Sequence, residues 1–97
     1  MKRGDVLGIQ QTLKAIGDPT RREILDLLKA GEKSAGEISE HFEATGATIS
    51  HHLSVLKNAG LIMDEKKGKY IYYEVNMTVF EEILSWMKAF TGGDKNE

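Results

Sequence analysis

The apolar residues of this chain change their spacing twice, and these changes constrain the fold more than any other feature. As far as Gly60 they recur every three or four residues, which is the period of amphipathic helices. From Leu61 to Val75 the chain is instead rich in β-branched and aromatic residues, which favour strands. The helical period returns from Val79 to Phe90. The pattern predicts a mainly α (α+β) fold with one β-hairpin inserted between helices.

Capping and turn residues divide the chain before Leu61 into four predicted helices. Asp18 can cap the second helix, Ser34 and Glu37 have the spacing of a capping box before the third, and Thr45 can cap the fourth. The predicted helices span residues 6–16, 19–30, 35–42 and 46–59.

The remaining elements are two strands and a fifth helix. They are expected at residues 61–66, 69–75 and 79–90. Lys67-Gly68 would form the hairpin turn, and Asn76 or Thr78 would cap the last helix. Short helices joined by a tight turn and followed by a two-stranded hairpin are typical of a winged helix-turn-helix. We therefore expect five helices, with a two-stranded wing between helices 4 and 5.

Length and composition narrow the class of protein. A chain of 97 residues is expected to form one domain, here residues 1–91, with a disordered tail at 92–97. The absence of cysteine excludes disulfides, thiolate metal sites and a cysteine nucleophile. No apolar run approaches the roughly 20 residues of a membrane span, and the first residues do not resemble a signal peptide, so a cytoplasmic protein without membrane insertion is expected.

The charge balance requires that any nucleic-acid site be local. Thirteen lysines and arginines stand against fifteen acidic residues, which gives a formal net charge of −2. A DNA-binding protein of this composition must gather its cations on one face. An enzyme is not expected, because no paired acids, nucleophile–base set or glycine-rich phosphate loop is present.

The fourth helix carries the polar residues best suited to reading DNA. An α-helix fits the major groove with its first residues facing the base edges, and the start of this helix is small and polar. The alternative is a solvated helix start with an ordinary threonine cap. The candidate DNA contacts here are Thr45, Thr48, Ser50, His51 and, at the far end, Lys57.

The hairpin supplies the other candidate DNA contacts. Lys67 and Lys69 flank its tip and Tyr70 follows, which suits phosphate neutralisation or insertion into the minor groove. The alternative is a set of lysines that protects a strand edge from aggregation.

Surplus apolar residues on the last helix predict a dimer. Seven large apolar side chains in residues 79–90 exceed what one core-facing stripe requires, and a ligand pocket is the alternative use for them. The expected dimerisation residues lie on the first and last helices: Val6, Ile9, Leu13, Ile83, Trp86 and Phe90.

Three further residues are expected to be structural. Arg21 and Arg22 lie beside acidic residues, and Arg22 has the spacing of a helical ion pair with Asp26. His52 is expected to pack between the fourth helix and the wing. It cannot chelate a metal together with His51, because adjacent helix positions point about 100° apart.

Several segments of the chain resemble the ArsR/SmtB family of winged helix-turn-helix transcriptional repressors. These segments are residues 18–25, 49–53, 56–61 and 67–73. The resemblance implies a homodimer that binds double-stranded DNA at a palindromic, inverted-repeat operator and blocks transcription. The adjacent histidines and the tyrosine-rich strand are most similar to the SdpR-type autorepressor subgroup, which also implies a protein partner, such as a membrane protein, that relieves repression.

The chain departs from the metal-sensing members of that family. Those members carry a Cys-x-Cys pair on the third helix or Asp, His and Glu ligands on the last, whereas residues 35–42 contain no cysteine and residues 79–90 no histidine. Gly46 and Ala47 also stand where relatives often carry polar or proline residues. We therefore expect no metal and no cofactor at those sites. The alternatives are a protein-sequestration module and a metal-responsive repressor with an atypical site.

Overall fold

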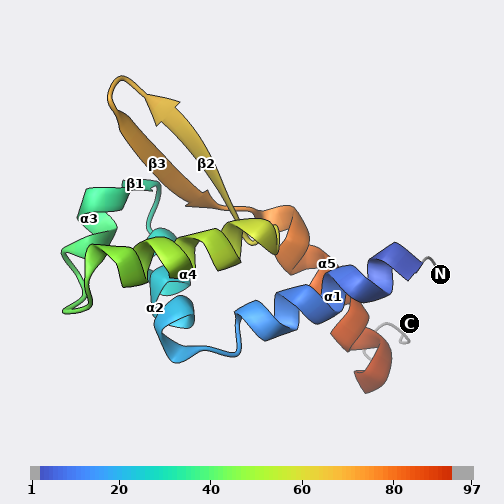
Figure 1. Cartoon of the computed structure of the whole chain (residues 1–97). Helices are drawn as coiled ribbons and strands as arrows, with labels where there is room; N and C mark the ends of the chain where they lie inside the picture. The colour runs from blue at the N-terminus through green and yellow to red at the C-terminus, as the bar shows by residue number, and fades with distance from the viewer. Residues whose placement is uncertain (1–2, 93–97) are drawn as a thin grey trace.

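A computed structural model describes residues 3–92, with side chains from Gly8 onward. In chain order the elements are α1 (Arg3–Ala15), α2 (Pro19–Leu28), β1 (Lys33–Ser34), α3 (Ala35–Ser39), α4 (Gly46–Asn58), β2 (Ile62–Lys67), β3 (Tyr70–Val75) and α5 (Met77–Thr91). This order confirms the predicted winged helix-turn-helix. The β2–β3 hairpin projects at one end of the molecule, while α1 and α5 extend together at the other (Figure 1). The predicted tail, residues 92–97, lies outside the described residues except for Gly92.

The predicted caps are confirmed because each depends only on neighbouring residues. The carboxylate of Asp18 accepts hydrogen bonds from the backbone of α2, at 2.7 Å from the Thr20 nitrogen. Ser34 and Glu37 form the full capping box of α3. The hydroxyl of Thr45 accepts from the first turn of α4, and Asn76 caps α5.

Several helix boundaries differ from the prediction, by up to three residues. The third helix ends at Ser39 rather than residue 42, because the amides of His41 and Phe42 turn back to carbonyls only three residues away. These tighter bonds close the helix and lead into the loop before α4. The first helix begins at Arg3, earlier than the expected residue 6.

The sheet has three strands, whereas a two-stranded hairpin was predicted. β1 pairs antiparallel with β3, with Lys33 opposite Tyr73, so the strand order is β1-β3-β2. In the hairpin Lys67 pairs with Tyr70, which places the turn at Gly68-Lys69 rather than at Lys67-Gly68. Gly68 has a φ of +65°, a conformation that glycine adopts without steric cost.

The hydrophobic core lies where α2, α3 and α4 meet the base of the hairpin. Its largest fully buried side chains are Ile24, Ile38, Ile49, Leu56 and Leu61. The inward residues of α4 lock this helix against the body of the protein. From α5 only Ile83 joins the buried core, so most of that helix lies outside it. Among the described residues no helix is both long and apolar enough to span a membrane.

Candidate nucleic-acid interface

One edge of α4 is anchored in the core and the opposite edge faces solvent. Ile49, Leu53 and Leu56 are buried, and they fix the orientation of the helix. The four candidate contacts at the start of the helix are all exposed: Thr45, Thr48, Ser50 and His51.

The first turn of α4 is open as well as polar. The hydroxyl of Thr45 accepts from the Thr48 amide at 3.2 Å and donates to the Thr48 hydroxyl at 3.1 Å. A side chain at Gly46 would meet no atom within 4 Å. Space therefore remains beside the start of the helix, and helix N-termini favour negative charge.

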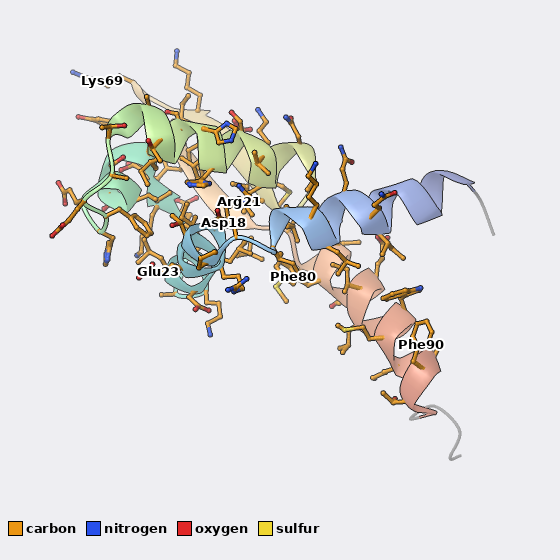
Figure 2. All side chains as sticks on the ribbon, turned by 60° about the horizontal axis from the view of Figure 1, so that its bottom comes forward. Asp18, Arg21, Glu23, Lys69, Phe80 and Phe90 are labelled. Carbon is orange, nitrogen blue, oxygen red and sulfur yellow. The ribbon has the colours of Figure 1, made fainter. Side chains whose placement is uncertain are left out.

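The hairpin tip carries cations in two different states. The ammonium of Lys67 lies 2.7 Å from a carboxylate oxygen of Glu32 and 5.5 Å from the ring centroid of Tyr72. The hydrogen bond to Glu32 raises the pKa of Lys67. Lys69, at the tip, makes no hydrogen bond or ion pair with another described residue, and Tyr70 beside it is exposed. Lys69 and Phe90 lie at opposite ends of the molecule (Figure 2).

The last candidate cation connects α4 to the wing. The ammonium of Lys57 lies 2.9 Å from a carboxylate oxygen of Asp64 on β2. This hydrogen bond raises the pKa of Lys57. Asp64 pairs across the hairpin with Tyr73, whose pKa is raised by burial first and by the Asp64 charge second. Lys57 and Lys67 thus already hold carboxylate partners in the free protein.

The opposite end of the molecule presents apolar side chains on α1 and α5. Trp86 is 40% and Phe90 73% exposed, and their rings meet edge to face with centroids 4.9 Å apart. Leu13 is also exposed and Ile9 is half-buried. Of the other expected dimerisation residues, Ile83 is buried in the protomer's own core, and Val6 is in α1 but outside the residues whose side chains the structure describes.

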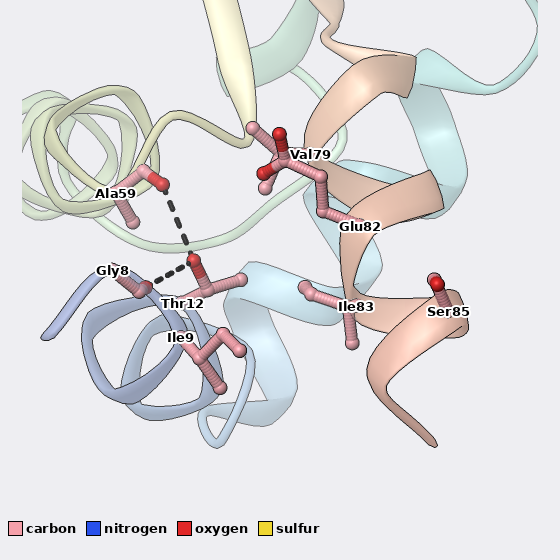
Figure 3. Close-up of a pocket in the computed structure, with 8 residues that line it drawn as sticks. All are labelled: Gly8, Ile9, Thr12, Ala59, Val79, Glu82, Ile83 and Ser85. Carbon is pink, nitrogen blue, oxygen red and sulfur yellow. Dashed lines mark hydrogen bonds between the residues drawn. The ribbon is translucent and has the colours of Figure 1, made fainter. Parts of the chain in front are cut away.

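A hollow of about 470 Å³ separates α1, α5 and the end of α4 (Figure 3). Its lining includes Ile9, Ala59, Glu82 and Ile83. The buried hydroxyl of Thr12 donates to the Gly8 carbonyl at 2.8 Å and lies 3.4 Å from the Ala59 carbonyl, so α1 contacts the end of α4 here.

The comparisons with known proteins identify the family. Residues 18–64 match the family described as "Bacterial regulatory protein, arsR family". The chain is 48% identical over 89 residues to the transcriptional repressor SdpR of Bacillus subtilis (strain 168), covering 92% of this chain and 99% of SdpR. The chain belongs to the ArsR family. It is a DNA-binding regulator of transcription and not an enzyme.

Other ArsR-family proteins agree in sequence and fold. An arsenical resistance operon repressor of Staphylococcus aureus is 38% identical over 72 residues, covering 74% of this chain and 69% of that protein. The crystal structure of a possible transcriptional regulator for arsenical resistance has a TM-score of 0.75 at 32% identity, covering 82% and 83% of the two chains. A homodimeric winged helix-turn-helix domain from Mycobacterium bovis has the same fold, with a TM-score of 0.74 at 24% identity over 100% and 95% of the two chains.

One contact of this ArsR-family chain was not expected from the sequence. His52 was predicted to pack between the fourth helix and the wing; the contact that the structure shows is with α2, where its Nδ1 lies 3.1 Å from a guanidinium nitrogen of Arg21. The predicted Arg22–Asp26 ion pair is also absent from the described residues. Arg22 donates instead to the Ile16 carbonyl at 2.8 Å, and Asp26 pairs with Lys29 at 3.6 Å.

The described part of this ArsR-family chain contains no group of three or more His, Cys, Asp or Glu side chains placed to hold a metal ion. His51 and His52 have ring centroids 5.7 Å apart and planes tilted by 54°, and His52 is already engaged by Arg21.

Proposed function

We propose that this protein is a homodimeric repressor that places α4 in the major groove of an inverted-repeat operator. The observation that carries the proposal is the exposed polar edge of α4, held in place by the buried residues Ile49, Leu53 and Leu56. A rigidly anchored helix with a small, polar N-terminal half can approach base edges closely.

The contacts with DNA divide between the helix and the wing. Thr48, Ser50 and His51 would meet base edges or phosphates, and Thr45 with the open first turn would meet a phosphate. From the hairpin, Lys69 and Tyr70 would contact the backbone or minor groove. Lys57 and Lys67 would contact phosphate in exchange for the carboxylates they now hold, and these are the weaker contacts of the set.

The dimer would form through the α1 and α5 end of the protomer. The exposed side chains of Leu13, Trp86 and Phe90, with Ile9 and Val6, offer an apolar surface, and the Mycobacterium bovis protein of the same fold is described as homodimeric. Ile83, which is buried, would pack beneath these exposed side chains within the same protomer. A two-fold dimer would present its two α4 helices to half-sites about 34 Å apart, one turn of B-DNA.

We further propose that the signal is not a metal at the positions used by metal-sensing members, in keeping with the absence of a ligand cluster among the described residues. The repressor would act in the cytoplasm. A protein partner would relieve repression by docking on a further set of exposed apolar side chains on α5, those of Met77, Leu84 and Met87. A zinc titration of operator binding checks the first point: unchanged affinity is expected, and zinc-dependent release would restore the metal-responsive alternative.

The proposed function is tested by selecting duplexes from a random library with the purified wild-type protein. We expect enrichment of an inverted repeat. The variant Ser50→Ala with His51→Ala should then lose discrimination between the selected duplex and a scrambled one, because each bidentate base contact contributes about 1–3 kcal/mol. The matched control is His41→Ala with Ser85→Ala, which removes the same residue types from exposed positions away from α4. Failure of the wild type to enrich any duplex would leave only the protein-interaction alternative.

A further inference from the structure

The guanidinium group of Arg21 joins three helices. From the first turn of α2, its Nε donates to the Ala15 carbonyl at 2.6 Å, and one terminal nitrogen lies 3.4 Å from the Lys14 carbonyl. The other terminal nitrogen lies 3.1 Å from Nδ1 of His52 on α4. One side chain therefore connects the last turn of α1 to the middle of α4, and Figure 2 shows Arg21, which is half-buried, between α2 and α4.

The chemistry of the two groups fixes the protonation of the histidine. A guanidinium has only donors, so Nδ1 of His52 must accept, which requires a neutral ring with its proton on Nε2. The guanidinium of Arg21 and the carboxylate of Asp18 face this ring from α2, and the ring of its neighbour His51 lies beside it on α4. Protonation of Nδ1 would remove the acceptor that the hydrogen bond with Arg21 requires.

The residues that Arg21 contacts lie next to residues of the proposed dimer surface and of the proposed DNA-binding surface. Lys14 and Ala15 directly follow Leu13, which is on the proposed dimer surface, and His52 directly follows His51, a proposed DNA contact. Among the described residues, Arg22, the next residue of α2, donates only to the Ile16 carbonyl and makes no hydrogen bond with α4. Arg21 thus holds α4 against the helix through which the two protomers would meet.

We propose that Arg21, acting through neutral His52, is a positioning residue that sets the angle between the recognition helix and the dimer axis. The inference rests on the proposed function. In a two-fold dimer both α4 helices must enter successive major grooves together. A small rotation of α4 relative to α1 would therefore worsen the fit to DNA in both half-sites. Removing the contact should therefore weaken operator binding more than it weakens the fold, which the buried residues of α4 hold independently.

The first test compares Arg21→Gln with Arg22→Gln, two neighbouring variants that make the same change in charge. Binding to the duplex selected by the wild type is measured by fluorescence anisotropy. We expect Arg21→Gln to weaken binding about tenfold and Arg22→Gln less than about twofold, as expected for loss of charge-assisted hydrogen bonds. Light scattering and thermal melts should show both variants dimeric and folded at the assay temperature. Equal losses in the two variants would overturn the inference.

A double-mutant cycle then asks whether the two side chains act as one unit. Combining Arg21→Gln with His52→Ala should cost no more than about twofold beyond Arg21→Gln alone, because coupled residues are non-additive. His52→Asn, whose amide oxygen can occupy the place of Nδ1, should recover most of the affinity lost in His52→Ala. Additive losses, or no recovery in His52→Asn, would contradict the coupling.

Failure of this inference can be told apart from failure of the proposed function. If the wild type selects no duplex, the proposed function itself fails. If the wild type binds the selected duplex and Arg21→Gln binds it equally well, only the inference about Arg21 fails.

Discussion

The ammonium of Lys57 lies 2.9 Å from the carboxylate of Asp64, so the last turn of α4 is tied to the first strand of the wing. Because the same ammonium cannot neutralise a phosphate fully while it holds a carboxylate, Asp64 competes with DNA for Lys57. We predict that Asp64→Asn strengthens binding to the selected duplex by several-fold at low salt, and that this gain shrinks as salt is raised.

A matched variant separates release of Lys57 from the general loss of negative charge. Glu65→Gln removes one carboxylate from the adjacent position of β2, which is exposed and does not contact Lys57. Its effect on affinity should be smaller than that of Asp64→Asn. If the two variants gain equally, Lys57 is not the residue released.

The two lysines at the tip of the wing should differ in their salt dependence. Lys69 makes no ion pair with another described residue, whereas Lys67 already holds Glu32 at 2.7 Å. Each phosphate contact contributes about 0.9 to the slope of log affinity against log salt. Lys69→Gln should therefore reduce the slope by about one, and Lys67→Gln by clearly less. A salt titration of both variants measures this, and a larger change for Lys67→Gln than for Lys69→Gln would contradict the assignment of Lys67 as the weaker phosphate contact.

The features predicted correctly from the sequence are those that nearby residues determine. The carboxylate of Asp18 and the hydroxyls of Ser34 and Thr45 cap helices that begin within three residues of them. The alternation between helical and strand periods likewise sufficed to order the five helices and the hairpin. The exposed edge of α4 followed from the same periodicity, because Ile49, which had to face inward, fixes where the polar residues point.

The features that were missed depend on contacts between distant parts of the chain. The two-residue strand β1 exists because Lys33 meets Tyr73, and a segment so short carries no period of its own. The Arg21–His52 contact depends on how α2 crosses α4. The carboxylate partner of Lys57 could not be predicted either, since nothing in the spacing shows which strand residue faces the helix end. Candidate cations could thus be recognised from the sequence, but whether they were free could not.

The proposed dimer surface is tested most directly at Trp86. A carboxylate at this position would face the apolar side chains of the second protomer, and burying an unpaired charge costs several kcal/mol. We predict that Trp86→Glu is monomeric in light scattering at concentrations where the wild type is dimeric, and that it binds the selected duplex at least about tenfold more weakly.

Lys88→Gln is the control for this variant, because it also changes the charge by one unit on the same helix. Lys88 lies on the side of α5 away from Trp86 and Phe90, and its side chain is exposed. It should remain dimeric. A dimeric Trp86→Glu protein would move the interface elsewhere on the molecule.

The Asp18 cap of α2 should make the free energy of unfolding depend on pH in the acidic range. The backbone amides of Arg21 and Thr20 donate to the Asp18 carboxylate and hold its pKa below the usual value, although desolvation opposes the shift. Since the folded pKa lies below that of the unfolded chain, the stabilisation is complete above the usual aspartate range and is lost as the pH falls through it. Urea titrations between pH 6 and 3 should therefore show Asp18→Asn losing less stability than the wild type, because asparagine also caps helices but does not titrate. The remaining carboxylates are common to both proteins, so identical losses would show that Asp18 does not contribute to the acid dependence.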